Sequence, residues 1–200
     1  KELVKSKYDL RAMIKLIAAS RTYQLSVDPN ENNMVDERNH SRALLRRLPA
    51  EVLLDAVSQV TGIKEKFHGV PAGSRAIQLW DSQVQHYFLK LFGRPARVSA
   101  CECERAVGAS MAQALHLMNS PRLESKLNHA GGQIARMTGR QKNDASLVRE
   151  LYLAVFSRLP SDIEQERSEQ YLGSRRFQRQ KAAEDLVWAM MNSVEFIFNH

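Results

Sequence analysis

The sequence predicts a mainly α protein: an irregular multi-helix bundle with at most one short strand or hairpin region. Apolar residues recur at helical spacing in several segments, and capping residues or prolines precede those segments. The 200 residues are 44% hydrophobic, which suffices for a substantial core. We expect one helical domain over residues 1–200, with 1–130 and 144–200 as candidate subregions. Because the chain begins with Lys, we interpret it as a fragment of a longer protein.

The first predicted helix lies in "YDLRAMIKLIAAS", where Asp9 is placed to cap the start. Its apolar residues share one stripe, which we expect to be buried: Leu10, Met13, Ile14, Ile17 and Ala18. The following "SVDPNENNMVDERN" is polar and rich in turn formers, so it is predicted to be a loop.

The second predicted helix begins after Pro49 in "RLPAEVLLDAVSQVTG" and ends at Gly62. Its expected apolar face consists of Val52, Leu53, Ala56, Val57 and Val60. Alternation of Arg75, Ile77 and Leu79 predicts a short strand or extended segment. "VQHYFLKLFGRP" predicts a short buried helix, and residues 97–105 are predicted to be an extended or irregular segment.

Two further helices are predicted in "GASMAQALHLMNSPRLESKLN", with Ser120 capping the second and Pro121 in its first turn. "HAGGQIARMTGRQKND" is glycine-bearing and polar, which predicts a linker. In the last third, Asp144 is expected to cap one helix, and Ser161 with Glu164 to form a capping box for the next. "QKAAEDLVWAMMNSVEFIF" predicts a long final helix. Because short segments connect these three helices, we expect them to form an antiparallel bundle.

The net charge of +7 raises the question of an anionic partner. The positive excess is spread thinly over residues 1–143, and residues 144–200 carry a small negative charge. No segment resembles a basic arm, so nucleic-acid or anionic-polymer binding ranks third among the functions considered. No apolar run approaches the roughly 20 residues of a membrane span.

Both cysteines lie in "ACECER", where Cys101 and Cys103 would point to the same side of an extended segment. A zinc site needs two more ligands, and His86, His116 and His129 are nearest in sequence but irregularly spaced. We favour buried small hydrophobes over a metal site or a strained disulfide. Arg105 beside Glu102 and Glu104 suggests an ion-pair network. We expect no metal and no cofactor.

Three arginines precede the helix that starts after Pro49, namely Arg42, Arg46 and Arg47. Guanidinium groups there could clamp a phosphate, sulfate or uronate. We favour the alternative that Arg42 and Arg46 form a solvated helical face or pair with Glu51 and Asp55, because no aromatic residue interleaves with the cluster.

Catalytic motifs are weak. His116 lies between two leucines of a predicted helix, where an interior or boundary histidine is favoured over a general base. No Gly-x-Ser-x-Gly elbow or nucleotide-binding glycine fingerprint occurs.

Several segments together resemble the C-terminal domain of unknown function of large planctomycete proteins. They are "YDLRAMIKLIAASRTYQLS", "RLPAEVLLDAVSQVTG", "ACECER", "ALHLMNSP", "ELYLAVFSRLPSDIE" and "DLVWAMMNSVEFIFNH". The resemblance implies an exported parent protein, periplasmic or at the cell surface, that often carries a second uncharacterised domain and a cytochrome c-like module. It supplies no catalytic residues. A Cys-x-x-Cys-His haem motif is absent from this chain.

We therefore expect a noncatalytic helical interaction or structural module of an exported multidomain protein. Its partners would be other domains of the parent protein, or a protein or polysaccharide. The alternative is an accessory part of a hydrolytic or redox enzyme acting on polysaccharide. For that alternative the first candidates are Cys101, Cys103, Arg105 and His116.

Overall fold

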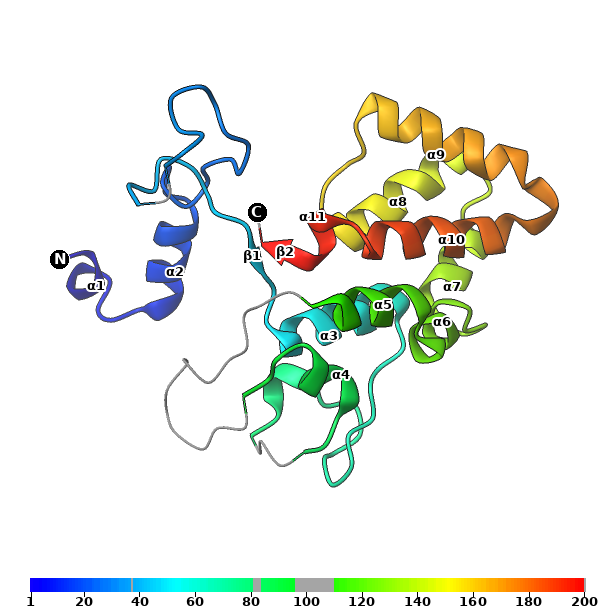
Figure 1. The fold of residues 1–200 in the computed structure, drawn as a ribbon, viewed down its shortest axis with the longest axis horizontal. Coiled ribbons are helices and arrows are strands. Elements are labelled where there is room, and N and C mark those ends of the chain that lie inside the picture. The colour runs from blue at the N-terminus through cyan, green and yellow to red at the C-terminus, as the bar shows by residue number, and fades with distance from the viewer. Residues whose placement is uncertain (37, 81–83, 96–109, 200) are drawn as a thin grey trace. The chain divides into compact units, whose positions relative to one another are not determined.

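A computed structural model describes residues 1–200 except 37, 81–83, 96–109 and 200. The chain divides into two compact units (Figure 1). Unit 1 comprises Lys1–Arg46 with Phe198–His200, and unit 2 comprises Arg47–Ile197. The mainly α fold class is confirmed in the described residues.

Unit 1 contains α1 (Glu2–Lys5) and α2 (Leu10–Ala18). The predicted cap is confirmed, because the Asp9 carboxylate accepts hydrogen bonds from the backbone N–H groups of Arg11 and Ala12. The prediction of a buried stripe is wrong: α2 buries none of its residues, and Leu10 is 67% exposed. Among the described residues of unit 1, the only other helix is the four-residue α1, which is too short to cover an amphipathic face.

The only strands among the described residues are β1 (Arg46–Arg47) and β2 (Phe198–Asn199), which form a two-stranded sheet. The segment around Ile77, which was predicted to be a short strand or extended, is instead a 3₁₀ turn, η1 (Ala76–Gln78). The carboxylate of Asp55 explains the difference, because it accepts hydrogen bonds from the backbone N–H groups of Ala76 (2.6 Å) and Ile77 (3.1 Å). These contacts stabilise a helical turn rather than a strand.

The first long helix of unit 2 is α3 (Ala50–Thr61), which starts after Pro49 as predicted. Leu53, Val57 and Val60 are buried as expected, whereas Val52 and Ala56 are half-buried. The helix ends at Gly62, whose φ of +72° is a left-handed conformation that glycine adopts at low cost.

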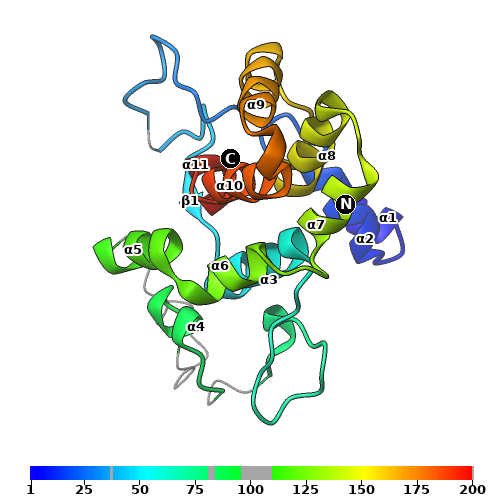
Figure 2. The same cartoon turned by 90° about the vertical axis from the view of Figure 1, so that its right-hand side faces the viewer.

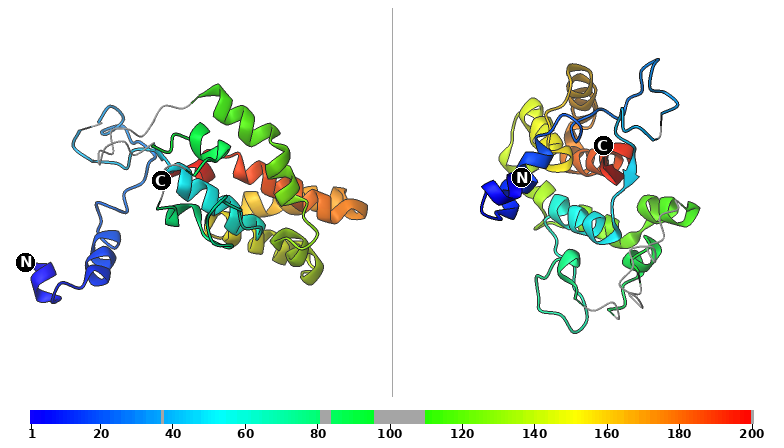
Figure 3. Two further views of the ribbon diagram at one scale, coloured as in Figure 1. Left: turned by 90° about the horizontal axis from the view of Figure 1, so that it is seen from below. Right: turned by 90° about the vertical axis from the view of Figure 1, so that its left-hand side faces the viewer.

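Three shorter helices follow: α4 (Tyr87–Leu91), α5 (Met111–Asn119) and α6 (Pro121–Leu127). Ser110 and Gln113 form a capping box at the start of α5. Ser120 occupies the N-cap position of α6 as predicted, but its side chain makes no capping hydrogen bond. The two helices meet at this residue as consecutive green ribbons in Figure 3.

The predicted linker is wrong, because residues 133–140 form α7 (Gln133–Arg140). Ile134, Met137 and Thr138 lie on one face at i, i+3 and i+4 and are buried. The helix contacts α3, α8 (Asp144–Phe156) and α10 (Arg179–Met191). Thr138 is polar, and its hydroxyl donates to the carbonyl oxygen of Ile134 within the helix.

The last third contains α8, α9 (Asp162–Ser174), η3 (Arg176–Gln178), α10 and α11 (Val194–Ile197). Helices α8, α9 and α10 pack against one another (Figure 2). The capping box of Ser161 and Glu164 is confirmed. Asn143, not Asp144, caps α8, and Asp144 instead accepts from Arg179 Nε at 2.7 Å. The predicted final helix is interrupted at Asn192 and Ser193.

Two helices organise the core of unit 2. Helix α3 contacts η1, α4, α6 and α7, and α10 contacts α6, α7, α8, α9 and α11. Helices α6 and α7 thus touch both central helices, and they fix the spacing between the two halves of the unit.

Candidate functional site

An enclosed group of charges surrounds Glu65, four residues after α3 ends. The Glu65 side chain is 7% exposed, and its Oε2 lies 3.1 Å from Lys126 Nζ of α6. His86 Nε2 lies 3.6 Å from Glu65 Oε1, and the more exposed Arg122 approaches the same oxygen at 3.2 Å. One carboxylate therefore connects the loop after α3 with the start of α4 and with α6.

The charge of Glu65 is maintained by its neighbours. Burial alone would raise the pKa of this carboxyl, but the facing His86 and the charge of Lys126 outweigh burial and lower the pKa to about 2. Glu65 is therefore ionised at neutral pH, where it balances the buried ammonium of Lys126.

Lys126 is not arranged as a general base. Its Nζ contacts Glu65 Oε2, donates to the carbonyl oxygen of Ile63 at 2.7 Å, and donates to Ser58 Oγ at 3.4 Å. Three acceptors use all three protons of an ammonium group. Deprotonating Lys126 would weaken these contacts, so the pair of Lys126 and Ser58 does not resemble an activated nucleophile.

The predicted candidate His116 lies on the inner face of α5, within an aromatic cluster. Its ring centroid is 5.2 Å from that of Tyr87 and 5.7 Å from that of Phe88. Burial, followed by the charge of His86, lowers the pKa of His116. The cluster favours a neutral imidazole that packs against rings.

The other predicted metal ligands are only partly brought together. His86 and His116 interact electrostatically, whereas His129 Nδ1 accepts from the backbone N–H of Gly131 in the turn before α7. Within the described ranges, no group of three or more His, Cys, Asp or Glu side chains could hold a metal ion. Cys101, Cys103 and Arg105, with Glu102 and Glu104, lie outside the described residues.

The three predicted anion-binding arginines have different surroundings. Arg47 packs over the Phe92 ring, donates to Phe92 O at 3.1 Å, and contacts Gln113 Oε1. Arg46 is exposed, and adjacent residues of a strand point to opposite sides. Arg42 donates to the carbonyl oxygen of Val27 at 3.5 Å.

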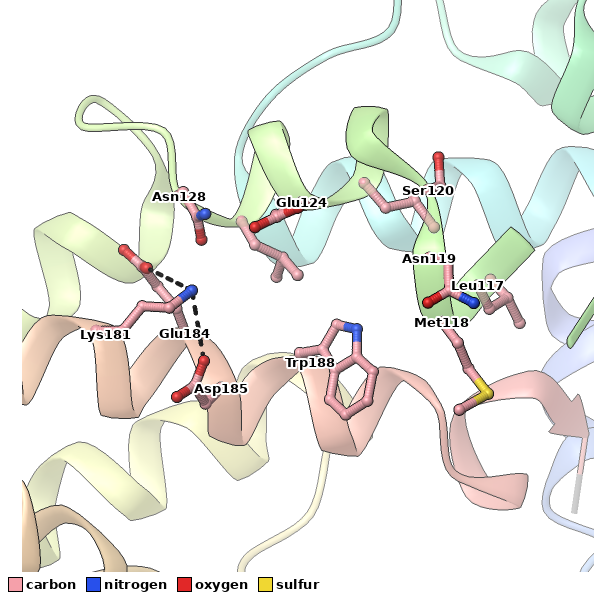
Figure 4. A pocket seen from close by; sticks show the side chains of 12 residues that line it. Leu117, Met118, Asn119, Ser120, Glu124, Asn128, Lys181, Glu184, Asp185 and Trp188 are labelled. Carbon is pink, nitrogen blue, oxygen red and sulfur yellow. Dashed lines mark ion pairs between the residues drawn. The ribbon is translucent and has the colours of Figure 1, made fainter. Parts of the chain in front are cut away.

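A groove lies where α5 and α6 face α10 (Figure 4). Its volume is about 330 Å³. Trp188 projects from α10 into the middle of the groove, and Met118 lies toward one end. At the other end Lys181 pairs with Asp185 at 3.4 Å and with Glu184 at 3.9 Å. The groove thus has charged side chains at one end, and Met118 with the uncharged polar residues Asn119 and Ser120 at the other.

An exposed apolar face continues from this groove along α5. Met111, Leu115 and Met118 occupy positions i, i+4 and i+7 and are 78%, 52% and 52% exposed. The opposite face of α5 buries Gln113 and Leu117. Sequence analysis missed this surface, although a helix that is apolar on two faces was a visible signal in "MAQALHLMN".

A family model described as a protein of unknown function (DUF1553) matches residues 1–172. The chain belongs to this family. The DUF1553 match includes α5 and α6 and ends within α9, so it does not extend to Trp188. No curated protein and no solved structure matches the chain. In the described part of this DUF1553 chain, no helix combines the length and hydropathy needed to cross a bilayer.

Proposed function

We propose that this DUF1553 chain is a noncatalytic helical module that binds a protein partner through the outer face of α5. The observation that carries this proposal is the exposed stripe of Met111, Leu115 and Met118. A contiguous apolar helix face next to a groove is typical of protein-binding surfaces. Methionine suits such a surface because its flexible side chain adapts to different partners.

The surroundings of the enclosed polar groups support a noncatalytic role. Lys126 and Glu65 neutralise one another, and His116 is packed among rings. Arg158 donates to both oxygens of Glu164 and to both oxygens of Glu195, which ties α9 and α11 to the end of α8. These groups are occupied in holding elements together, and none of them lines the groove.

A photo-crosslinking experiment tests the proposal in cells that make the protein. A benzoylphenylalanine at position 115 samples the outer face of α5, and one at the exposed position 166 of α9 serves as the control. We expect a crosslink to a defined partner polypeptide at 115 and none at 166. Equal crosslinking at positions 115 and 166 would contradict the proposal. Catalytic turnover by the purified chain would also contradict it, if His116→Ala abolished that turnover.

The proposal includes an exported, multidomain parent protein, which is what the resemblance described above implies. The partner would then be another domain of the parent or a separate exported protein. Fractionation of cells with an antibody against the chain tests this part. Recovery of the parent protein from the cytosol alone would contradict it.

A further inference from the structure

The outer face of α5 and the groove form one continuous surface. Met111 and Met118 are seven residues apart, so the stripe is about 10 Å long, which corresponds to two helical turns. At its end Met118 and Trp188 both line the groove, and Trp188 is 38% exposed. A surface of this length accommodates apolar anchors spaced i, i+3 or i+4, and i+7 on a partner helix.

The charge of the groove favours one class of partner helix. Three acids line it, Glu124 on α6 with Glu184 and Asp185 on α10, against the single base Lys181. Glu184 and Asp185 already face Lys181, and Asp185 also lies 3.5 Å from Arg175. Glu124 is exposed on the opposite wall. Glu124 is therefore the acid best placed to meet a basic side chain from a partner.

We propose that this surface binds a basic amphipathic helix of a protein partner, with apolar side chains on α5 and Trp188 and a lysine or arginine beside Glu124. This inference rests on the proposed interaction function and specifies the chemistry of its partner. The excess of acid repels nucleic-acid phosphates and anionic lipid headgroups, which would otherwise be candidates for a protein of positive net charge.

The test uses the whole 200-residue chain carrying Trp80→Phe, which leaves Trp188 as the single tryptophan. The probes are two synthetic amphipathic helices with the same leucine face, one flanked by lysine and the other by glutamate. Trp188 fluorescence reports occupancy of the groove, and calorimetry gives the affinity. We expect saturable binding of the lysine peptide, binding at least about tenfold weaker for the glutamate peptide, and weaker lysine-peptide binding as salt rises.

Three variants locate the binding site. Leu115→Asp should abolish binding, and Glu124→Lys should reverse the preference between the two peptides. Glu166→Lys makes the same charge change at an exposed position of α9 and should alter affinity by less than about twofold. Circular dichroism of each variant excludes unfolding as the cause.

Each other outcome overturns the inference. Equal affinity for both peptides, no binding, or no effect of Glu124→Lys would show that the charge assignment is wrong. A concentration-dependent dimer lost in Leu115→Asp would identify a second copy of this chain as the occupant. Crosslinking at position 115 without peptide binding would reject this partner class while leaving the interaction module intact. Absence of both crosslinking at position 115 and peptide binding would also reject the proposed interaction function.

Discussion

Glu65 stands between two lysines in "KEKF", a pattern of alternating charge that ordinarily lies in solvent. Its burial depends on Lys126 and His86, which are distant in sequence, so a local pattern could not reveal it. The same holds for Asp55, whose role is to bind the backbone of Ala76 and Ile77. Sequence patterns identified residues at helix ends, but they could not identify which charges pair across the core.

Removing one partner of the enclosed ion pair should be costly. Lys126→Met removes the buried cation that faces Glu65 and leaves the exposed Arg122 beside this carboxylate. We expect a loss of about 3–5 kcal/mol in the free energy of unfolding. Arg122→Met is the matched control, because Arg122 contacts the same carboxylate but is 62% exposed. It should cost under about 1 kcal/mol. Urea denaturation measures the unfolding free energy of both variants. Equal losses of stability in Lys126→Met and Arg122→Met would contradict the account.

The pair should also give stability a defined pH dependence. The pKa of Glu65 is about 2 in the folded chain against an ordinary value of 4.5, so ionised Glu65 stabilises the fold above pH 4.5. This contribution, on the order of 3 kcal/mol, is lost as the pH falls from 4.5 towards 2. The difference in unfolding free energy between wild type and Glu65→Gln should shrink over that range. If the difference in unfolding free energy between wild type and Glu65→Gln did not change with pH, the stabilising role of ionised Glu65 would be contradicted.

At the scale of the element, caps and apolar periodicity predicted most helices of unit 2. The starts of α3 and α9 were predicted correctly because Pro49 and the pair of Ser161 and Glu164 act within a few residues. Helix α7 was missed because three glycines and several polar residues in "HAGGQIARMTGRQKND" obscured the helical spacing of Ile134, Met137 and Thr138. Its stability comes from packing against α3 and α10, which a local pattern does not contain.

The end of α3 should be sensitive to a single methyl group. A Cβ at Gly62 would lie 3.0 Å from Arg136 Nη2 and 3.1 Å from the backbone nitrogen of Gln133. Gly62→Ala should therefore cost more than the roughly 1–2 kcal/mol of a left-handed alanine. Gly69→Ala is the control, since Gly69 has a φ of +73° and nothing within 4 Å. Thermal unfolding compares the stability of the two variants. Similar losses of stability in Gly62→Ala and Gly69→Ala would show that close packing at Gly62 is unimportant.

The junction of α8, α9 and α11 should depend on Arg158, which contacts two carboxylates and packs over Tyr152 and Phe156. Arg158→Gln should lower the unfolding free energy by about 2 kcal/mol. Arg175→Gln, which breaks a single longer ion pair with Asp185, should lower it by less than about 1 kcal/mol. Chemical denaturation that ranks the two variants in the opposite order would contradict this.

At the scale of the whole molecule, the sequence predicted the fold class but not the surface. Met118 and Trp188 lie in different helices, and only the packing of α6 on α10 brings them to one groove. Met190 and Met191 of the same helix are buried, whereas Trp188 is 38% exposed. The exposure of Trp188 depends on which face of α10 the neighbouring helices leave uncovered, and the sequence of α10 does not contain that information.

The most direct test of the interaction account is amide hydrogen exchange of the intact chain, with and without the lysine-flanked helical peptide. The account predicts slower exchange in α5, in α6 and in α10 around Trp188, and no change in α9 or α2. Slower exchange confined to other elements, or no change in any of them at saturating peptide, would contradict the claim that the outer face of α5 is the binding surface.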